Sequence, residues 1–229
     1  MSDLIDTTEM YLRTVYELLE EGVVPLRARI AERLHQSGPT VSQTVARMER
    51  DGLLVVDADR TIKLTREGAR LARDVMRKHR LAECLLTEVI GLEWEKVHDE
   101  ACRWEHVISV DVEKRLLAIL DQPTRSPYGN PIPGLRALGV EVPLTPFREG
   151  ADPLIDELTD QPQRFVLVRM SENIQADASM LADLAHIGLR PGGIFEASRA
   201  DGDVHLTVDG RDATIGLFAA ELLFVSRHG

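Results

Sequence analysis

Apolar residues recur every three or four positions over the first fifty residues, the spacing that places them on one face of a helix. Further on, two short runs rich in β-branched residues lie on either side of a polar turn, as in a β-hairpin. The chain therefore begins with three predicted helices, continues into a hairpin and then enters a long fourth helix. The predicted helices span 7–21, 26–35, 39–51 and 65–90, and the predicted strands span 53–56 and 61–64.

This order of elements is typical of a winged helix-turn-helix. A tight turn at 36–38 joins the helical segments 28–34 and 37–50, which together form the two-helix unit that inserts into a DNA major groove. Pro39 stands at the start of the second segment, where a proline is favoured because its missing N–H would have no partner there. Other small helical domains share this periodicity, so charge and motifs must add to it.

The rest of the chain changes character twice. Two more helices are predicted, and then repeated prolines between 123 and 153 predict a linker that is partly packed at best. Beyond it, short strands with glycine-rich turns predict a small β-barrel. The predicted elements are helices at 94–109, 111–120 and 178–187, strands at 164–170, 194–198 and 204–208, and mixed turns and strand at 215–225.

The net charge of the 229-residue chain, −11, argues at first against a nucleic-acid partner. Its distribution reverses that inference. Residues 22–80 carry thirteen Lys and Arg residues against seven Asp and Glu residues, a net +6, while the rest of the chain carries −17. A basic segment in an acidic protein is typical of a DNA-binding module, although a solvated charged surface has the same composition.

Composition also limits where the protein is expected to act. Hydrophobic residues make up 44% of the chain, and no apolar run approaches the length of a membrane span. The first residues lack the basic and apolar regions of a secretory signal. Two cysteines, Cys84 and Cys102, do not make a disulfide framework. We therefore expect a cytoplasmic protein with no membrane partner.

Four metal-binding side chains follow one another at steps of four, three and one residues: His98, Cys102, Glu105 and His106. Positions three and four apart share one side of a helix, so a helix over 94–109 directs all four into one volume. Nitrogen, sulfur and oxygen donors together suit a divalent transition metal.

The preceding helix offers a second pair, His79 and Glu83, on one face. Donor pairs on facing helices are a common way to hold a metal between them. The spacing is compatible with His79, Glu83 and His98 around one ion and the other three donors around a second, although single pairs of this kind are often surface residues. Cys84 lies off the donor face and fits a small buried hydrophobe.

Six stretches carry a further signal: DTTEMYLR from Asp6, LRARIAERL from Leu26, QSGPTVSQTV from Gln36, VMRKHRLAE from Val75, VHDEACRWEH from Val97 and PYGNPIPG from Pro127. Together they resemble the diphtheria toxin repressor / iron-dependent repressor family of actinobacteria. The resemblance covers about residues 1–140, and the C-terminal part matches in outline.

The resemblance implies a homodimeric, Fe²⁺-activated repressor that is mainly α-helical with a small β domain. It implies a winged helix-turn-helix DNA-binding domain at 1–73 and a helical dimerisation and metal-binding domain at 74–140. A proline-containing linker at 141–160 would lead to a C-terminal SH3-like β-barrel at 161–229. Such a protein is a regulator and not an enzyme.

Two metal sites follow from the same resemblance. Met10 enters through it alone, because a methionine at helical spacing is normally a core residue. Glu172 and Gln175 enter because they match a Glu-x-x-Gln pair that the SH3-like domain supplies. The implied primary site is Met10, Cys102, Glu105 and His106, and the implied ancillary site is His79, Glu83, His98, Glu172 and Gln175.

A thioether and a thiol in the primary site favour a softer ion than Mg²⁺ or Ca²⁺. In this family, Mn²⁺-sensing relatives have carboxylates at the positions of Met10 and Cys102, so the sulfur ligands favour Fe²⁺. We expect Co²⁺, Ni²⁺, Mn²⁺ and Zn²⁺ to substitute in vitro, because affinity order does not single out iron. An ion bound by both sulfurs would order the N-terminal helix and tie it to the dimer core, which favours one arrangement of the DNA-binding heads.

On double-stranded DNA, the start of the recognition helix is expected to face the bases while arginines contact phosphates. A two-fold dimer predicts a pseudo-palindromic operator, and the family implies operators of iron-homeostasis genes. For any single arginine a solvated basic face is an equally good interpretation. The candidate contacts are Arg27, Ser37, Pro39, Thr40, Ser42, Gln43, Arg47, Arg50 and Arg60.

Three alternatives stay open at this point. The first is a Mn²⁺- or Zn²⁺-sensing repressor of the same architecture. The second is a metal-storage protein or metalloenzyme built on the helical donors, although the sequence contains no nucleophile elbow, P-loop or His-Glu-x-x-His motif. The third is a structural zinc site in a winged helix that responds to another signal.

Overall fold

The computed structural model describes residues 6–143 and 145–228, which form two compact units. The first unit contains the chain up to Ala82, Cys102–Gln122 and the residues from Ile132 to the gap at 144. The second contains Glu83–Ala101, Pro123–Pro131 and the chain from Thr145 onward. Helices α4 (Arg66–Leu85) and α5 (Trp94–Trp104) each contribute residues to both.

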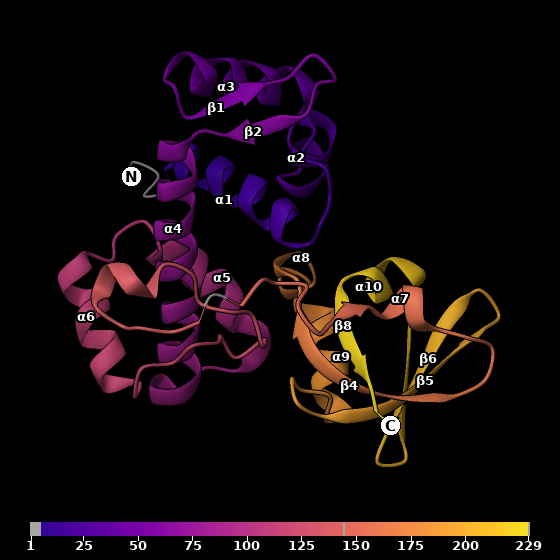
Figure 1. Ribbon diagram of the computed structural model, residues 1–229. Helices are drawn as coiled ribbons and strands as arrows, with labels where there is room; N and C mark the ends of the chain where they lie inside the picture. Colours follow the sequence, from indigo (N-terminus) through magenta and orange to yellow (C-terminus); the bar gives the residue numbers. More distant parts are fainter. Residues whose placement is uncertain (1–5, 144, 229) are drawn as a thin grey trace. The chain divides into compact units, whose positions relative to one another are not determined.

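The first unit begins with a winged helix-turn-helix (Figure 1). The elements are α1 (Thr7–Glu20), α2 (Arg27–Arg33), α3 (Gly38–Arg50) and the antiparallel hairpin β1 (Leu54–Val56) with β2 (Ile62–Leu64). The Asp6 carboxylate caps α1, and the Ser37 hydroxyl caps α3 just before Pro39. The predicted elements are confirmed here, with ends displaced by no more than two residues.

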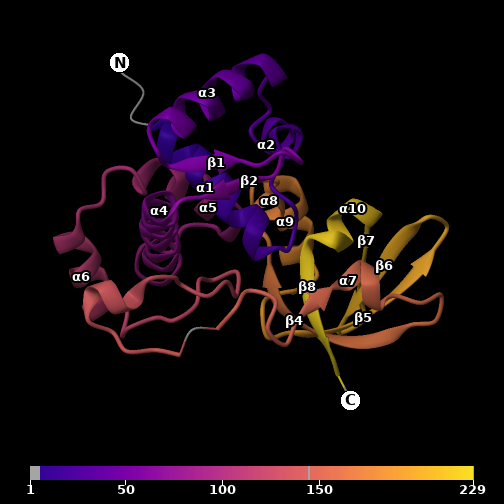
Figure 2. The same ribbon diagram turned by 45° about the horizontal axis from the view of Figure 1, so that its top comes forward.

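The apolar faces of these elements form one core. Figure 2 shows α3 beside α2 and β1. Each large aliphatic side chain that is fully buried stabilises the fold by about 1.5–3 kcal/mol. The buried members are Tyr11, Leu12, Val15, Leu18, Ile30, Val41, Val45, Met48, Leu54, Ile62 and Ala72.

The long fourth helix differs from its prediction at the C-terminal end. Helix α4 ends at Leu85, and a π-helical turn, η1 (Leu86–Ile90), follows it. Gly91 then ends this turn with φ of 73°, a left-handed conformation that glycine adopts without strain.

Helix α5 is also shorter than predicted, and here the sequence interpretation was wrong. The helix ends at Trp104, so Glu105 and His106 lie in the turn that follows and not on the same helical face as His98 and Cys102. The N–H groups of Val107 and Ile108 both donate to the carbonyl of Trp104, which closes this turn. The chain must turn there because Ser109, in an extended conformation, caps the next helix, α6 (Val110–Ile119).

The proline-rich segment is more tightly packed than the sequence suggested. A short 3₁₀ helix, η2 (Leu135–Leu138), lies within it in the first unit. In the second unit, the ring of Tyr128 stacks on Trp94 with centroids 4.9 Å apart, and its hydroxyl donates to the Trp94 carbonyl at 2.7 Å. The expectation of a linker that is partly packed at best is therefore wrong between Ser126 and Leu135, where six of the ten residues are buried.

The second unit is built on a six-stranded antiparallel sheet with the order β3-β8-β4-β5-β6-β7. The C-terminal sheet agrees with the predicted small β domain, but the sequence missed the strands β3 and β7 and three short helices, α7, α8 and α10. The strands are β3 (Asp152–Pro153), β4 (Gln163–Met170), β5 (Ile194–Ala200), β6 (Asp203–Val208), β7 (Arg211–Ile215) and β8 (Leu223–Arg227). The helices are α7 (Leu154–Glu157), α8 (Glu172–Gln175), α9 (Ala178–His186) and α10 (Leu217–Glu221).

At Gly129 the proline-rich segment lies close to the backbone of β4. The carbonyl of Tyr128 accepts a hydrogen bond from the N–H of Met170 at 3.0 Å. Gly129 itself has φ of 83°, and a Cβ atom there would lie 2.1 Å from the carbonyl oxygen of Val168. The close approach therefore depends on the missing side chain.

We expect Gly129→Ala to lower the free energy of unfolding by about 3 kcal/mol, because left-handed strain and steric overlap add. Gly139→Ala is the matched control: its φ is 87°, but nothing lies within 4 Å of the new Cβ, so only the strain of about 1 kcal/mol applies. Urea unfolding of both variants measures the difference. Equal losses at the two positions would contradict the proposed close packing.

Among the described residues, no helix is long and apolar enough to cross a membrane.

Candidate metal centre

Two residues predicted for the primary site, Cys102 and Glu105, contact the guanidinium group of Arg13, and so does His79, which was predicted for the ancillary site. Arg13 projects from α1, and its Nη1 lies 2.6 Å from Oε2 of Glu105 and 3.2 Å from Sγ of Cys102. Nδ1 of His79, from α4, lies 3.2 Å from the same Nη1 and 2.7 Å from Oε2 of Glu105. A thiol, a carboxylate and an imidazole from two helices and a turn therefore converge on one positive charge.

The charges in this cluster shift the pKa values of its members. Burial alone would raise the pKa of Glu105, which is 1% exposed, but the positive charge of Arg13 and the hydrogen bond with His79 lower it below its ordinary value. Burial would likewise lower the pKa of Arg13, but the electrostatic interactions with Cys102, Glu105 and Glu17 raise it well above its ordinary value. The carboxylate and the guanidinium are thus both charged at neutral pH.

His106 faces the same cluster from the other side. Its Nε2 lies 3.4 Å from Oε1 of Glu105, and its Nδ1 lies 2.7 Å from Oε2 of Glu9 in the first turn of α1. Burial lowers the pKa of His106, but the hydrogen bond to Glu9 and the charge of Glu105 more than compensate, so the pKa is raised. The sequence reasoning passed over both Glu9 and Arg13, because charged residues in a helix are usually solvated.

Met10 is one residue from Glu9 on α1. Its side chain is partly buried and packs against the apolar core of the winged helix-turn-helix. This placement agrees with the core interpretation that its helical spacing alone favoured. Its role as a metal ligand remains a prediction.

The second predicted site is His79, in the first unit, with four residues that lie among buried side chains of the second unit: Glu83, His98, Glu172 and Gln175. Nδ1 of His98 lies 3.6 Å from Oε1 of Glu83 and 3.6 Å from Oε2 of Glu172. All three residues are at most 4% exposed. The side-chain amide of Asn130 donates to Oε1 of Glu172 at 3.2 Å, which orients that carboxylate. The sequence reasoning did not include Asn130.

Gln175 follows Glu172 by three residues in the one-turn helix α8, so the two share a side of it. Its Nε2 donates to the carbonyl of Met170 at 3.0 Å. Its Oε1 is buried and has no hydrogen-bond partner among the described residues. A buried acceptor of this kind calls for a donor or a cation, which fits the ligand role expected for Gln175.

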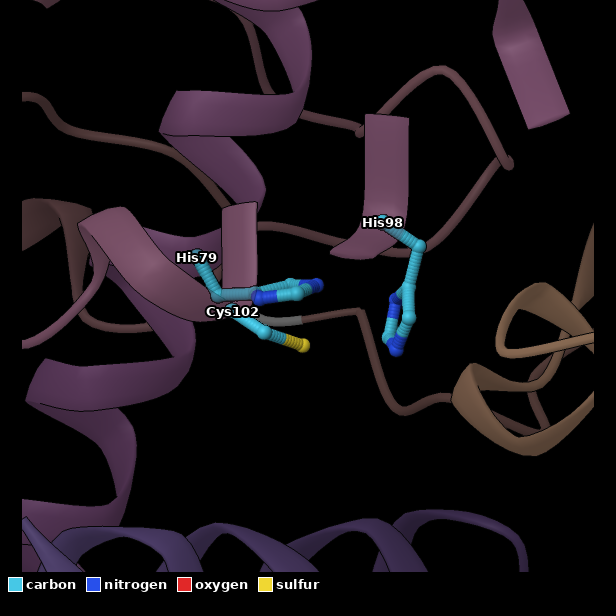
Figure 3. Close-up of side chains that lie close together, drawn as sticks. All are labelled: His79, His98 and Cys102. Carbon is cyan, nitrogen blue, oxygen red and sulfur yellow. The ribbon is translucent and has the colours of Figure 1, made fainter. Parts of the chain in front are cut away.

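Helices α4 and α5 carry four of the predicted ligands: His79 and Glu83 on α4, and His98 and Cys102 on α5. Figure 3 shows His79 from α4 and His98 and Cys102 from α5. His79 and Cys102, both in the first unit, have ligand atoms within 4.8 Å of each other. In the second unit, the ligand atoms of Glu83, His98 and Glu172 meet the same limit. These mixed nitrogen, oxygen and sulfur donors suit a divalent transition metal.

The predicted DNA contacts lie on α2, α3 and the hairpin turn. All are exposed except Arg27, which is half-buried. The Ser37 hydroxyl already accepts a hydrogen bond from the N–H of Thr40 as the cap of α3. Exposed polar side chains at the start of α3 are the arrangement that the recognition helix of a helix-turn-helix requires.

Comparisons with known proteins agree with these features. A family model described as "Iron dependent repressor, N-terminal DNA binding domain" matches residues 3–62. Another, described as "Iron dependent repressor, metal binding and dimerisation domain", matches residues 65–134. The diphtheria toxin repressor of Corynebacterium diphtheriae is 54% identical over 220 residues, covering 94% of each chain. The chain belongs to the iron-dependent repressor family.

Other members of the iron-dependent repressor family are equally similar. The iron-dependent repressor IdeR of Mycobacterium tuberculosis is 54% identical over 217 residues, 93% of each chain. Among solved structures, a manganese-dependent transcriptional repressor in complex with manganese has a TM-score of 0.79 at 28% identity, covering 97% of this chain and all of that one. The T. acidophilum IdeR structure has a TM-score of 0.75 at 27% identity, covering 97% and 99%.

Membership settles the class of the protein. It is a metal-dependent repressor of this family with a DNA-binding domain and a metal-binding and dimerisation domain, so it binds DNA and forms homodimers. Its relatives are transcriptional repressors and not enzymes. The predicted family, fold class and function are confirmed.

Proposed function

We propose that Fe²⁺ is the activating ion and that it binds at Met10, Cys102, Glu105 and His106. The observation that carries the proposal is the convergence of the Cys102 thiol and the Glu105 carboxylate on a single cationic group of α1. A cation held there connects the first helix of the DNA-binding domain to residues of the dimerisation domain. Iron is the ion named for the relatives at 54% identity.

The donor chemistry supports iron over the hard ions. A thiolate and an imidazole prefer transition metals, whereas Mg²⁺ and Ca²⁺ prefer oxygen ligands. The Cys102 thiol loses its proton to solvent when a metal binds, so metal affinity decreases as the pH is lowered. When bound, Fe²⁺ supplies charge and directional ligand bonds, and no redox chemistry is needed for a regulatory role.

We further propose that His79, Glu83, His98, Glu172 and Gln175 hold the ancillary ion. The support is the burial of His98 between two carboxylates, together with the buried Oε1 of Gln175. This set has no sulfur, so it is harder than the primary set and accepts Mn²⁺ or Zn²⁺ more readily.

Metal binding is proposed to act by favouring one position of α1. A bound ion that needs ligands from α1 and from the turn after α5 binds only when the two are in register, which shifts the population toward that state. Changing a mostly idle protein into a mostly competent one takes about 5 kcal/mol of preference, which several metal–ligand bonds supply.

On DNA, we propose that each protomer of the dimer places α3 in a major groove. Gln43 would address a base edge, Pro39 and Thr40 thymine methyl groups, and Ser37 and Ser42 phosphates. The arginines at 27, 47, 50 and 60 would contact phosphates. Two-fold symmetry then requires a pseudo-palindromic operator, for which we propose those of iron-homeostasis genes. A regulator of bacterial operators acts in the cytoplasm, where the chromosome lies.

The test is operator binding by the purified protein under anaerobic conditions. Genomic fragments are first screened by gel shift with Fe²⁺, and the retained fragment is then titrated with Fe²⁺, Mn²⁺ and Zn²⁺ separately. We expect Fe²⁺ to raise operator affinity by about 100-fold or more and a chelator to reverse it. Equal operator affinity with and without metal would overturn the proposal.

A Mn²⁺-activated repressor is the second candidate, because a solved manganese-dependent repressor covers almost the whole chain at 28% identity. It predicts that Mn²⁺ activates at lower free concentration than Fe²⁺ in the same titration. The sulfur of Cys102 argues against it, since Mn²⁺ prefers oxygen ligands.

A further inference from the structure

Arg13 is a cation that already contacts two of the four proposed primary ligands. One nitrogen, Nη1, is within 3.2 Å of both Sγ of Cys102 and Oε2 of Glu105. The side chain is 12% exposed and that of Glu105 is 1% exposed, so water screens this pair weakly. Because Cys102 and Glu105 stabilise the guanidinium, the pKa of Arg13 is raised and the cation persists at neutral pH.

A divalent ion and this guanidinium group cannot use the same acceptors. Both need Sγ of Cys102 and Oε2 of Glu105, and two positive groups at ligand distance from one oxygen would lie a few ångströms apart and repel each other. A metal entering the primary site must therefore displace Nη1 of Arg13. The exchange makes no covalent change in Arg13, while the Cys102 thiol releases a proton to solvent as the metal–sulfur bond forms.

A second carboxylate, that of Glu17, can still bind Arg13 after the displacement. Nε of Arg13 lies 2.9 Å from Oε1 of Glu17, one turn further along α1. The other oxygen of Glu17 lies 3.7 Å from Nη1 of Arg33 on α2, and Arg33 also pairs with Glu21. These groups form a chain of buried charges from the primary site to the first helix of the helix-turn-helix unit, so moving Arg13 changes the electrostatics at α2.

We propose that Arg13 is an internal counter-cation that holds the primary donors together in the metal-free repressor and sets the metal concentration at which the repressor responds. The proposal rests on the primary site proposed above. Whatever Arg13 contributes to the stability of the metal-free form must be given up when the metal binds, so it weakens metal affinity by the same factor. Without Arg13, metal would bind more tightly and the metal-free protein would be less stable.

The test replaces the charge and keeps most of the side chain: Arg13→Gln. The matched control is Arg70→Gln, because Arg70 is an arginine of α4 whose ion pairs with Glu67 and Asp74 are exposed. Co²⁺ is the probe, since its thiolate charge-transfer absorption reports binding at Cys102 directly and needs no DNA. The thermal midpoint of the metal-free protein is measured in parallel.

We expect Arg13→Gln to bind Co²⁺ about tenfold more tightly and to melt at a lower temperature without metal, the size expected for losing one charge-assisted hydrogen bond. The control should match the unmodified protein in both measurements. General damage to the site can only weaken Co²⁺ binding, so tighter binding cannot be explained by damage. Co²⁺ affinity that is unchanged or weaker in folded Arg13→Gln overturns the inference. If Arg13→Gln does not fold, Arg13→Lys is measured instead. Lysine keeps the charge but reaches fewer acceptors, so this variant should bind Co²⁺ a few-fold more tightly. Unchanged Co²⁺ affinity in Arg13→Lys would overturn the inference.

The two proposals fail in different ways. Absence of the charge-transfer band in the unmodified protein would contradict the primary site itself. A normal band in the unmodified protein with the same Co²⁺ affinity in both Arg13 variants would contradict only the role of Arg13.

Discussion

Cys102→Ala is expected to lose its metal response: the Fe²⁺ concentration needed for operator binding should rise by about 100-fold or more. Changing a residue that only orients a metal ligand typically costs 10–100-fold in affinity, so removal of a direct ligand should cost at least the upper end of that range. Cys102 is only half-buried, so the fold should tolerate alanine. Gel shifts at increasing Fe²⁺, with circular dichroism to check the fold, measure the effect.

Cys84→Ala is the matched control for this prediction. Cys84 is the other cysteine of the chain, is buried, and donates its thiol to the carbonyl of Arg125 at 3.4 Å. Burial raises the pKa of the Cys84 thiol, so the thiolate that a metal needs is disfavoured there. Its alanine variant should lose some stability and keep the normal Fe²⁺ response. If the two variants lost the response equally, the assignment of Cys102 as a ligand would be wrong.

Arg77→Met is expected to lower the free energy of unfolding by about 3–5 kcal/mol, because it leaves a buried carboxylate without its partner. Nε of Arg77 lies 2.7 Å from Oε1 of Glu113, and the side chains are 3% and 0% exposed. This pair joins α4 to α6, and Nη1 of Arg77 also donates to the carbonyl of Gly134 at 3.3 Å. Urea unfolding of the metal-free protein measures the loss.

Two comparisons separate this effect from ordinary packing. Arg70→Met removes an exposed arginine from the same helix and should cost about 0–1 kcal/mol, as for other surface ion pairs. The double variant Arg77→Met with Glu113→Leu removes both charges and should recover most of the loss. A double variant as unstable as the single one would show that packing, and not the uncompensated charge, dominates.

Much of the fold could be predicted because its signals are local. Helical periodicity, the caps at Asp6 and Ser37 and the turn before Pro39 each depend on a few neighbouring residues, and the observed α1 and α3 agree with them closely. The end of α5 could not be predicted in the same way, because the run from Trp94 to Ser109 is helical in pattern throughout. Helix α5 ends at Trp104 because Ser109 caps another helix, α6.

The candidate sites divide in the same manner. The donors themselves could be named from their spacing and from the family resemblance, and His98 with Cys102 needed only one helix. Glu105 lies beside Cys102 at Arg13 but comes from the turn after α5, so its position depends on the path of the chain beyond that helix. Asn130 could not be predicted at all, because its carboxylate partner, Glu172, is 42 residues away.

The sequence by itself determined the three N-terminal helices and the hairpin, the basic character of the DNA-binding segment and the set of residues with metal-binding chemistry. Each of these features depends on residues that lie close together in the sequence. Tertiary structure alone decided that Arg13 lies against Cys102 and Glu105, which are separated from it by 89 and 92 positions. It also decided that the segment around Tyr128 is packed rather than loose. Burial is the physical reason in both cases, since a charge or a ring removed from water must find a partner that the order of residues does not reveal.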